Sequence, residues 1–329
     1  MRRFERELIT EWRRLGLPSD DKTIVVAVSG GADSVSLMLA LDELKKAKKV
    51  EIRIVAAHFN HLLRGDESDA DETFVRELTS ERKLELAVGR SALSIKTNVE
   101  QKARVERYDF LQQTAANLKA TAVLTAHTVD DQAETFLLNL IRGSGLQGLS
   151  AISPIRRLTA AEPDVALIRP LLTWARRADT EGYCHELGVR YRSDTMNEDE
   201  AFTRVRLRKI LIPLLKDFNP KIVERLAETA RLLRSELPAD QHVSPEPLTT
   251  VDLLPLPPAE LKPLLRGWLA ANRGDLRGIE LKHIEAIERL IHSRKSGKTV
   301  ELPGGDSAFK QGGRLCFGKN LVEKRGADN

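Results

Sequence analysis

The sequence is poor in cysteine and has no long apolar run, and each shortage excludes a class of protein. Its 329 residues include two cysteines, Cys184 and Cys316, and no CxxC pair, so neither a zinc knuckle nor a cysteine-held cluster is indicated. Two cysteines in a chain of this length suit a reducing cytoplasm. No run approaches the ~18 apolar residues of a membrane span. The glutamate-bearing segment 1–9 also lacks the apolar core of a signal peptide. We therefore expect a cytoplasmic protein.

Charge is plentiful but unevenly spread. The chain is 41% hydrophobic and 30% charged, which suits a globular protein of about two domains. The net charge is only +4, yet residues 204–234 carry nine cations against three acids. Such a cluster can neutralise the phosphates of a nucleic acid, although a solvated helix face has the same composition. We call this segment the basic strip; its cations are Arg204, Arg206, Arg208, Lys209, Lys216, Lys221, Arg225, Arg231 and Arg234.

Expected strands and helices alternate through the first 142 residues. After an amphipathic helix at 1–16, the apolar patterns predict strands at 23–28, 52–57, 84–88 and 121–126 and helices at 34–47, 68–82, 100–118 and 131–142. This alternation predicts an α/β fold, a doubly wound parallel sheet of Rossmann-like form with helices on both faces. Ligands of such sheets bind at the carboxyl ends of the strands.

The second half of the chain does not show this alternation of strands and helices. It is mostly helical from 166 to about 235, and the prolines of 237–258 suit a linker. Two further helices, at 259–272 and 280–293, precede a β-like tail. We expect a catalytic domain at 1–217 and a mostly helical C-terminal domain at 218–329.

The most informative string is Ser29–Ser34, where a buried strand gives way to a helix. Its two glycines, Gly30 and Gly31, let the backbone approach a ligand, and the helix N-terminus favours negative charge. Ser29 and Ser34 add hydroxyl donors. Asp33 would repel a phosphate unless a divalent cation lies between them. An ordinary tight turn is the alternative.

Two further strings, 58–61 and 127–131, follow strand ends and should meet this loop in one crevice. Asp131, Glu134 and Thr135 share one helix face and could form a magnesium or amine site, or simply complement the helix dipole. Asp130 could cap the same helix.

Two arginines in the helix predicted at 100–118 form another candidate site. Arg104 and Arg107 are three residues apart, so they can point the same way and stabilise a transferring phosphoryl group. A surface helix paired through Glu100 and Glu106 is the alternative.

Two glycine strings are misleading. The string 143–148 matches GxGxxG but follows a helix, and 297–299 lacks both the earlier glycine and the strand of a P-loop.

The string Ser29–Ser34 resembles the SGGxDS loop of the ATP pyrophosphatases. Taken with the other strings, residues 22–217 resemble the tRNA(Ile)-lysidine synthetase family, and the Leu302–Gly305 string is similar to its C-terminal domain. The resemblance implies a short form without the further C-terminal domain of longer members. The remaining strings follow in the family's order: Ala57–Arg64, Ala103–Tyr108, Thr125–Thr135, Arg142–Leu149, Arg169–Leu172, Asp194–Asn197 and Arg204–Arg208.

The resemblance implies a ligase that uses ATP and Mg²⁺ to join free L-lysine to C2 of the first anticodon cytidine of tRNA(Ile) with a CAU anticodon, through an adenylated tRNA. It also implies a homodimer, the state in which members of the family are often found. It implies ATP binding by Ser29, Gly30, Gly31, Ala32, Asp33, Ser34 and His58, and metal binding by Asp33 and Asp131. Arg104 or Arg107 would act on the α-phosphate, and His127, Asp130 and Glu134 would line a lysine or base pocket. The tRNA would contact Arg204, Arg206, Arg208, Lys209 and the C-terminal domain.

Three rival functions follow from parts of the pattern. A tRNA thiolase shares the loop but usually needs paired cysteines. A small-molecule amide synthetase gives no reason for the basic strip. A non-enzymatic RNA-binding protein has no use for the Ser29–Ser34 loop.

Overall fold

A computed structural model describes residues 1–63, 65–91, 99–158, 165–192, 203–237, 247–274, 276, 278–293 and 297–319, without the side chains of 99–101. The chain forms two compact units, Met1–Glu236 and Leu237–Asn329. The family strings at Arg64 and Asp194–Asn197, and much of the expected linker, lie outside the described residues. No described helix has the length and apolar character needed to cross a membrane.

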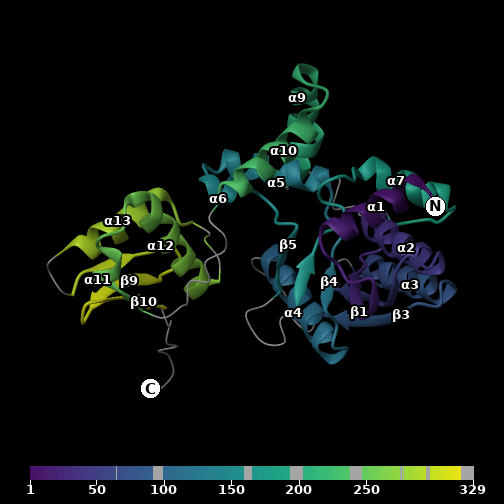
Figure 1. Cartoon of the computed structure of the whole chain (residues 1–329), viewed down its shortest axis with the longest axis horizontal. Coiled ribbons are helices and arrows are strands. Elements are labelled where there is room, and N and C mark those ends of the chain that lie inside the picture. Colours follow the sequence, from purple (N-terminus) through teal and green to yellow (C-terminus); the bar gives the residue numbers. More distant parts are fainter. Residues whose placement is uncertain are drawn as a thin grey trace. The chain divides into compact units, whose positions relative to one another are not determined.

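The first unit is built on a six-stranded sheet in the order β3-β2-β1-β4-β6-β5 (Figure 1). All neighbouring strands are parallel except β5, which runs antiparallel to β6 at the edge. The strands are β1 (Asp20–Ala27), β2 (Glu51–Asn60), β3 (Glu85–Arg90), β4 (Ala122–Leu124), β5 (Ile155–Arg157) and β6 (Ala166–Ile168). The expected strands that became β1 to β4 are thereby confirmed.

Helices cover both faces of this sheet. In the central strand β1, Ile24 and Val26 pack into one apolar core and Val25 into another. Because side chains alternate along a strand, a strand buried on both faces reads as a continuous apolar run. The covering helices are α1 (Arg3–Arg14), α2 (Ala32–Lys46), α3 (Asp66–Glu81), α4 (Val99–Asn117) and α7 (Arg177–Glu186). The doubly wound α/β fold is therefore confirmed.

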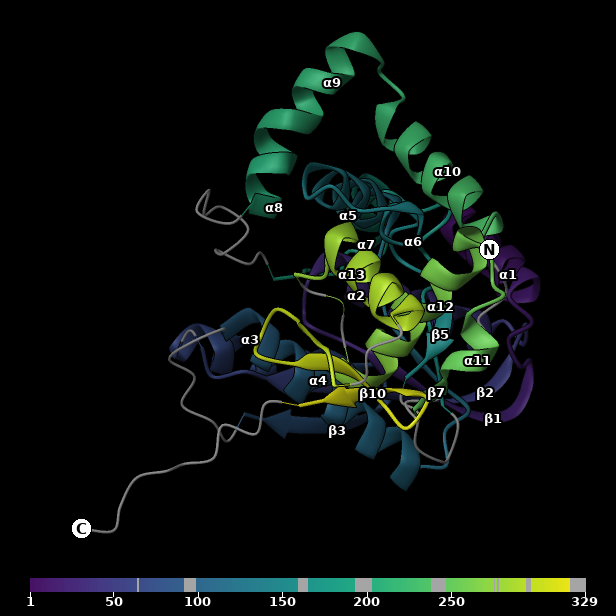
Figure 2. The ribbon, with the colours of Figure 1, turned by 90° about the vertical axis from the view of Figure 1, so that its left-hand side faces the viewer.

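The basic strip is part of the first unit. It contains α8 (Thr203–Arg206), a π-helix (Leu207–Leu211), α9 (Ile212–Phe218) and α10 (Ile222–Ser235), the last two forming a hairpin (Figure 2). Its Leu207 and Val223 pack against Val129 and Leu137 of α5 (Val129–Ile141). The compact units divide after Glu236, because this apolar face packs on α5. The catalytic domain at 1–217 and the C-terminal domain at 218–329 stay predictions.

The second unit has a core of its own. Helices α11 (Thr250–Leu253), α12 (Pro258–Arg273) and α13 (Leu281–His292) pack on an antiparallel sheet in the order β7-β10-β9-β8. Its core includes Trp268, Leu265 and Ile287. The helical region with a β-like tail is confirmed. The tail forms β8 (Thr299–Glu301), β9 (Ser307–Gln311) and β10 (Arg314–Gly318), and β7 (Leu248–Thr249), which precedes the helices, joins their sheet beside β10.

Candidate functional site

The loop between β1 and α2 presents an uncapped helix N-terminus. Gly31 is the N-cap of α2, and no described side chain caps it. The Ser34 hydroxyl closes the turn, since it accepts from the Ser29 amide at 3.1 Å and donates to the Gly31 carbonyl at 3.0 Å. The first amides of α2 therefore point out of the loop with the positive end of the helix dipole, as an anion site requires.

Glycine at position 30 is required by backbone conformation. Gly30 has φ +96°, which side-chain-bearing residues rarely adopt. A β-carbon there would also approach Arg192 to 3.4 Å, and the Arg192 amide donates to the Gly30 carbonyl at 2.9 Å. The loop is thus held open by a conformation that only glycine adopts easily.

Asp33 lies in the first turn of α2 and faces other acids. The Thr180 hydroxyl of α7 donates to its Oδ1 at 2.5 Å. Burial, followed by the nearby Asp131 and Asp130 carboxylates, raises the pKa of Asp33 to about 6 despite that hydrogen bond and the Arg177 charge. The carboxylate therefore lies where positive charge is in short supply, which suits a divalent cation.

The carboxylates of α5 already accept hydrogen bonds from arginines at the start of α7. Asp131 accepts from the Thr128 amide at 2.8 Å, as the N-terminal capping box of α5, and from Arg177 Nη2 at 2.7 Å. Asp130 accepts two bonds of 2.9 Å from Arg176. Although burial acts in the opposite direction, these bonds hold the pKa of Asp130 below its usual value. The capping role that the sequence suggested for Asp130 is filled by Thr128 and Asp131, because Thr128 is the N-cap of α5.

Glu134 is the most deeply placed acid of the group, with 1% of its surface exposed. It accepts from Arg177 Nη1 at 2.6 Å and from Arg208 Nε, in the π-helix, at 2.9 Å. We call Asp33, Asp130, Asp131 and Glu134 the acidic cluster. Its members come from α2 and α5 and are joined through α7.

The acidic cluster is not a ready-made cage for a metal. Among the residues that the structure describes, no group of three His, Cys, Asp or Glu side chains is arranged to hold an ion. Mg²⁺ commonly takes one or two carboxylates and completes its shell with water and phosphate oxygens. Asp33 fits such a site because it accepts a hydrogen bond from the neutral Thr180 hydroxyl, whereas Asp131 would first have to release Arg177.

Arginines gather around Tyr108 of α4. The guanidinium carbons of Arg104, Arg107 and Arg156 lie 5.1, 5.4 and 5.0 Å from the centre of its ring. Arg169, which follows β6 and is 3% exposed, donates to the Ser153 carbonyl at 2.5 Å. We call these four arginines the arginine cluster. Burial alone would raise the pKa of Tyr108, but the surrounding arginine charges lower it to about 8.

Histidines lie at the ends of two strands. His58 is buried, and its Nδ1 bonds to the Val28 carbonyl at 2.8 Å, beside the loop. Its Nε2 has no partner among the described residues. His127 bonds through Nδ1 to the Thr125 hydroxyl at 3.0 Å. Burial and then the charges of Arg169, Arg107 and Arg104 lower the pKa of His127, so its ring is neutral. The arginine cluster therefore lies near the end of β4, the strand beside β1.

The four cations expected to contact tRNA do not share one environment. Arg204, Arg206 and Lys209 are exposed, while Arg208 turns inward to Glu134. Arg176, Arg177 and Thr180 had no predicted role, because nothing local in the sequence shows that α7 packs beside α2 and α5. Arg169 and Tyr108 lie in two of the strings that resemble the family, Arg169–Leu172 and Ala103–Tyr108, and that resemblance could have pointed to them.

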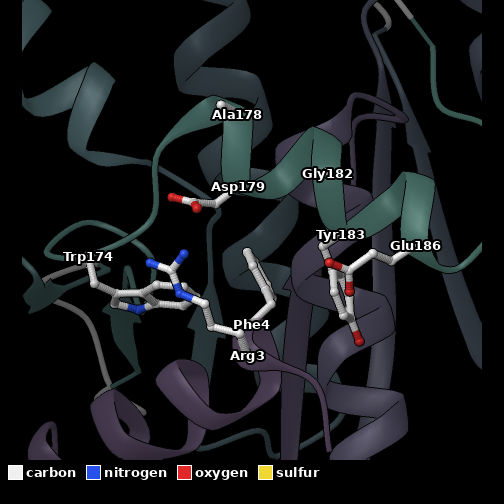
Figure 3. Close-up of a pocket in the computed structure, with 8 residues that line it drawn as sticks. All are labelled: Arg3, Phe4, Trp174, Ala178, Asp179, Gly182, Tyr183 and Glu186. Atoms are coloured by element: carbon white, nitrogen blue, oxygen red, sulfur yellow. The ribbon is translucent and has the colours of Figure 1, made fainter.

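A separate hollow lies between α1 and α7, lined by Arg3, Phe4, Trp174, Ala178, Asp179, Gly182, Tyr183 and Glu186 (Figure 3). Its aromatic wall is part of the core, since Phe4 stacks on Tyr183 at 4.6 Å and Tyr183 donates to Glu5 at 3.0 Å. None of the candidate site residues lines it.

A parallel sheet with an SGGxDS loop at the end of its central strand defines a nucleotide-binding protein of the PP-loop class. The family model of the PP-loop domain matches residues 4–215, and that of the TilS substrate binding domain matches residues 248–316. The chain belongs to the tRNA(Ile)-lysidine synthase family.

Relatives support this placement along most of the chain. The chain is 34% identical to the tRNA(Ile)-lysidine synthase of Dehalococcoides mccartyi over 88% of its own length and 65% of that protein. It is 34% identical to that of Thermosynechococcus vestitus over 90% of its own length and 84% of that protein. It thus spans about two thirds of the length of several curated relatives.

A solved structure agrees in fold. The U34-tRNA thiolase NcsA of Methanococcus maripaludis, solved with its [4Fe-4S] cluster, superposes with a TM-score of 0.59 at 16% identity. The match covers 73% of this chain and 82% of the thiolase. At this identity the likeness shows the fold alone.

Proposed function

We propose that this protein ligates free L-lysine to C2 of the first anticodon cytidine of tRNA(Ile) with a CAU anticodon, through an adenylated tRNA intermediate, with ATP cleaved to AMP and pyrophosphate. The observation that carries the proposal is the uncapped Ser29–Ser34 loop, which lies in one unit with an acidic cluster and an arginine cluster. Family membership supports the choice of substrates.

ATP binding falls to the loop. The α2 amides and the hydroxyls of Ser29 and Ser34 would hold the departing pyrophosphate, with Gly30, Gly31 and Ala32 giving the backbone its close approach. His58 would lie beside the bound nucleotide, since its ring bonds to the carbonyl of Val28, the residue that follows β1. Asp33, with Asp131 if Arg177 releases it, would hold Mg²⁺, which neutralises charge on the leaving group.

The first step would form the adenylate. The C2 oxygen of the cytidine attacks the α-phosphorus of ATP, and the bond to the β-phosphate oxygen breaks as pyrophosphate leaves. Arg104 and Arg107 would stabilise the charge that develops on the α-phosphate. The cytidine must leave its stack to reach this centre, which fits an unpaired anticodon loop.

The second step would add lysine. Its neutral ε-amine attacks C2, AMP leaves with the C2 oxygen, and the amine loses a proton. Glu134, Asp131 and Asp130 are the acids that could hold the incoming amine, and each now accepts from an arginine. His127 is neutral and could therefore lie beside a nucleobase without adding another positive charge.

The RNA would lie along exposed cations. Arg204, Arg206 and Lys209 are accessible for phosphate contacts, and we assign tRNA binding to the second unit as well. The possible homodimer stays a prediction.

A thiolase is disfavoured by its chemistry. Cys184 is fully buried, and burial raises the pKa of its thiol to about 12, so it is a poor nucleophile. Cys316 belongs to the other unit. Sulfur transfer therefore lacks the reactive cysteine pair that it usually needs.

The test is incubation with ATP, Mg²⁺, radiolabelled lysine and tRNA(Ile), with the label counted in RNA and the product tRNA weighed by mass spectrometry. We expect lysine in the RNA and tRNA-dependent pyrophosphate release. Asp33→Ala and Arg107→Ala should each lose pyrophosphate release by at least about 100-fold while tRNA binding survives. The control Arg53→Ala removes an exposed arginine near the start of β2, which pairs with Glu85 at the start of β3, and should behave as wild type.

Each result that contradicts the proposal would indicate a different function. A sulfur mass in the product would establish a thiolase, and turnover without RNA would establish a small-molecule synthetase. Binding of tRNA without ATP cleavage would leave an RNA-binding protein.

A further inference from the structure

The arginine cluster contains like charges without acids to balance them. Arg104 and Arg107 come from α4, Arg156 from β5, and Arg169 follows β6. No described carboxylate forms an ion pair with any of the four. Cations drawn from three elements would separate unless something held them, because each repels the others.

Tyr108 is the group that they share. Three guanidinium carbons lie within 5.4 Å of its ring centre, inside the ~6 Å range in which a cation is attracted to an aromatic face. Its phenol oxygen is buried next to Arg169 but has no well-formed hydrogen bond among the described residues. Tyr108 thus attracts Arg104, Arg107 and Arg156 through its ring, and its phenol oxygen lies beside Arg169.

Two members of the arginine cluster are exposed to solvent. Arg104 and Arg156 are exposed, whereas Arg169 is almost fully buried and Tyr108 is half-buried. Exposed guanidinium groups held in fixed positions, without competing acids, form a preorganised site for phosphate oxygens.

We propose that Tyr108 is a positioning residue that holds Arg104, Arg107 and Arg156 in place to receive the phosphate at which the adenylate forms. The inference rests on the proposed function, because it concerns the same reaction centre. It adds Tyr108 and Arg156 to the residues on which the chemistry depends. Tyr108 acts through the arginines and does not itself touch the reacting atoms.

The test is a pair of substitutions at one helix position, read by tRNA-dependent pyrophosphate release. Tyr108→Leu removes the ring and should lower kcat about 10–100-fold with little change in the KM for ATP, because the arginines stabilise charge that develops only in the transition state. Tyr108→Phe keeps the ring and should retain kcat within about threefold. Phe110→Leu is the matched control, since Phe110 lies on the same helix but packs on Phe59, and it should change kcat less than twofold.

A double-mutant cycle separates positioning from a merely structural role. If Tyr108 acts through Arg156, then Arg156→Ala should lower kcat in the wild type and have little further effect in Tyr108→Leu. Wild-type kcat in Tyr108→Leu, or fully multiplicative losses in the double variant, would overturn the proposal. Because the readout is pyrophosphate release, a wild-type enzyme that releases pyrophosphate but puts no lysine into RNA would refute the proposed function and leave this inference testable.

Discussion

At the scale of single residues, burial and then the Asp131 and Asp130 carboxylates raise the pKa of Asp33. Its folded-state pKa of about 6 lies above the ordinary value of 3.8, so between these pH values the folded state binds more protons than the unfolded chain. The free energy of unfolding must therefore decrease as the pH rises from about 4 to 6, and the loss persists above pH 6. Ionisation of Asp33 therefore lowers the free energy of unfolding at neutral pH.

This cost predicts that Asp33→Asn is more stable than the wild type at pH 7.5. The amide cannot ionise, so we expect about 1–3 kcal/mol of added stability, discounted for partial exposure, and a rise of a few degrees in Tm. The difference should vanish near pH 4, where the wild-type carboxyl is protonated as well. Thermal melts across pH measure it, with Asp20→Asn, on an exposed position of β1, as the control. A variant less stable than wild type at pH 7.5 would contradict the electrostatic account.

The residues of the loop could be predicted from sequence because their chemistry is local. Ser29–Ser34 are contiguous, and the glycine conformation and the helix N-terminus follow from that stretch alone. Thr180 and Arg177 could not be predicted, because they reach Asp33 and Glu134 only when α7 packs against the sheet unit. The partners of a charged site come from tertiary packing, which no local pattern records.

At the scale of elements, the same limit explains which strands and contacts the sequence did not predict. Strands β1 and β2 could be predicted from long apolar runs and β4 from the apolar run 121–126. The edge strand β5 shows no such pattern, because its three residues are exposed and two of them are arginines. The contact of Leu207 and Val223 with α5 could not be predicted either, because the sequence shows the charges of the basic strip but not the apolar partner of these two residues.

The π-helix gives the basic strip two different roles that substitution can separate. Arg206 and Arg208 stand two residues apart, but Arg206 is exposed while Arg208 bonds to the buried Glu134. Arg208→Ala should lower the free energy of unfolding by about 1–3 kcal/mol, because it removes one of the two cations bonded to a desolvated carboxylate.

Arg206→Ala is the matched comparison on the same segment. It should leave the melting temperature unchanged and weaken tRNA binding, reducing the slope of log K against log salt by about 1. Binding isotherms at several salt concentrations and thermal melts of both variants make the measurement. Equal destabilisation by the two changes would show that the inward bond of Arg208 contributes nothing to stability.

At the scale of the whole molecule, the two units have separate hydrophobic cores. Trp12 of α1 belongs to the core of the first unit, and Trp268 of α12 belongs to that of the second. Each is at most 1% exposed, and Trp268 packs edge-on against Phe317 at 6.0 Å. Units with cores of their own can unfold in separate steps.

We therefore expect the two tryptophans to report on different unfolding transitions. Trp268→Ala should remove about 3–5 kcal/mol from the second unit alone, and Trp12→Ala a similar amount from the first. ATP with Mg²⁺ binds the first unit in the proposed function, so it should raise only the transition that Trp12→Ala lowers. Calorimetry of both variants with and without ATP tests this. Trp268→Ala should still bind ATP but lose tRNA-dependent turnover, since tRNA binding is assigned partly to the second unit. If each substitution shifted one common transition, and ATP raised that same transition, the two cores would be a single cooperative structure, and no separate role could be given to the second unit.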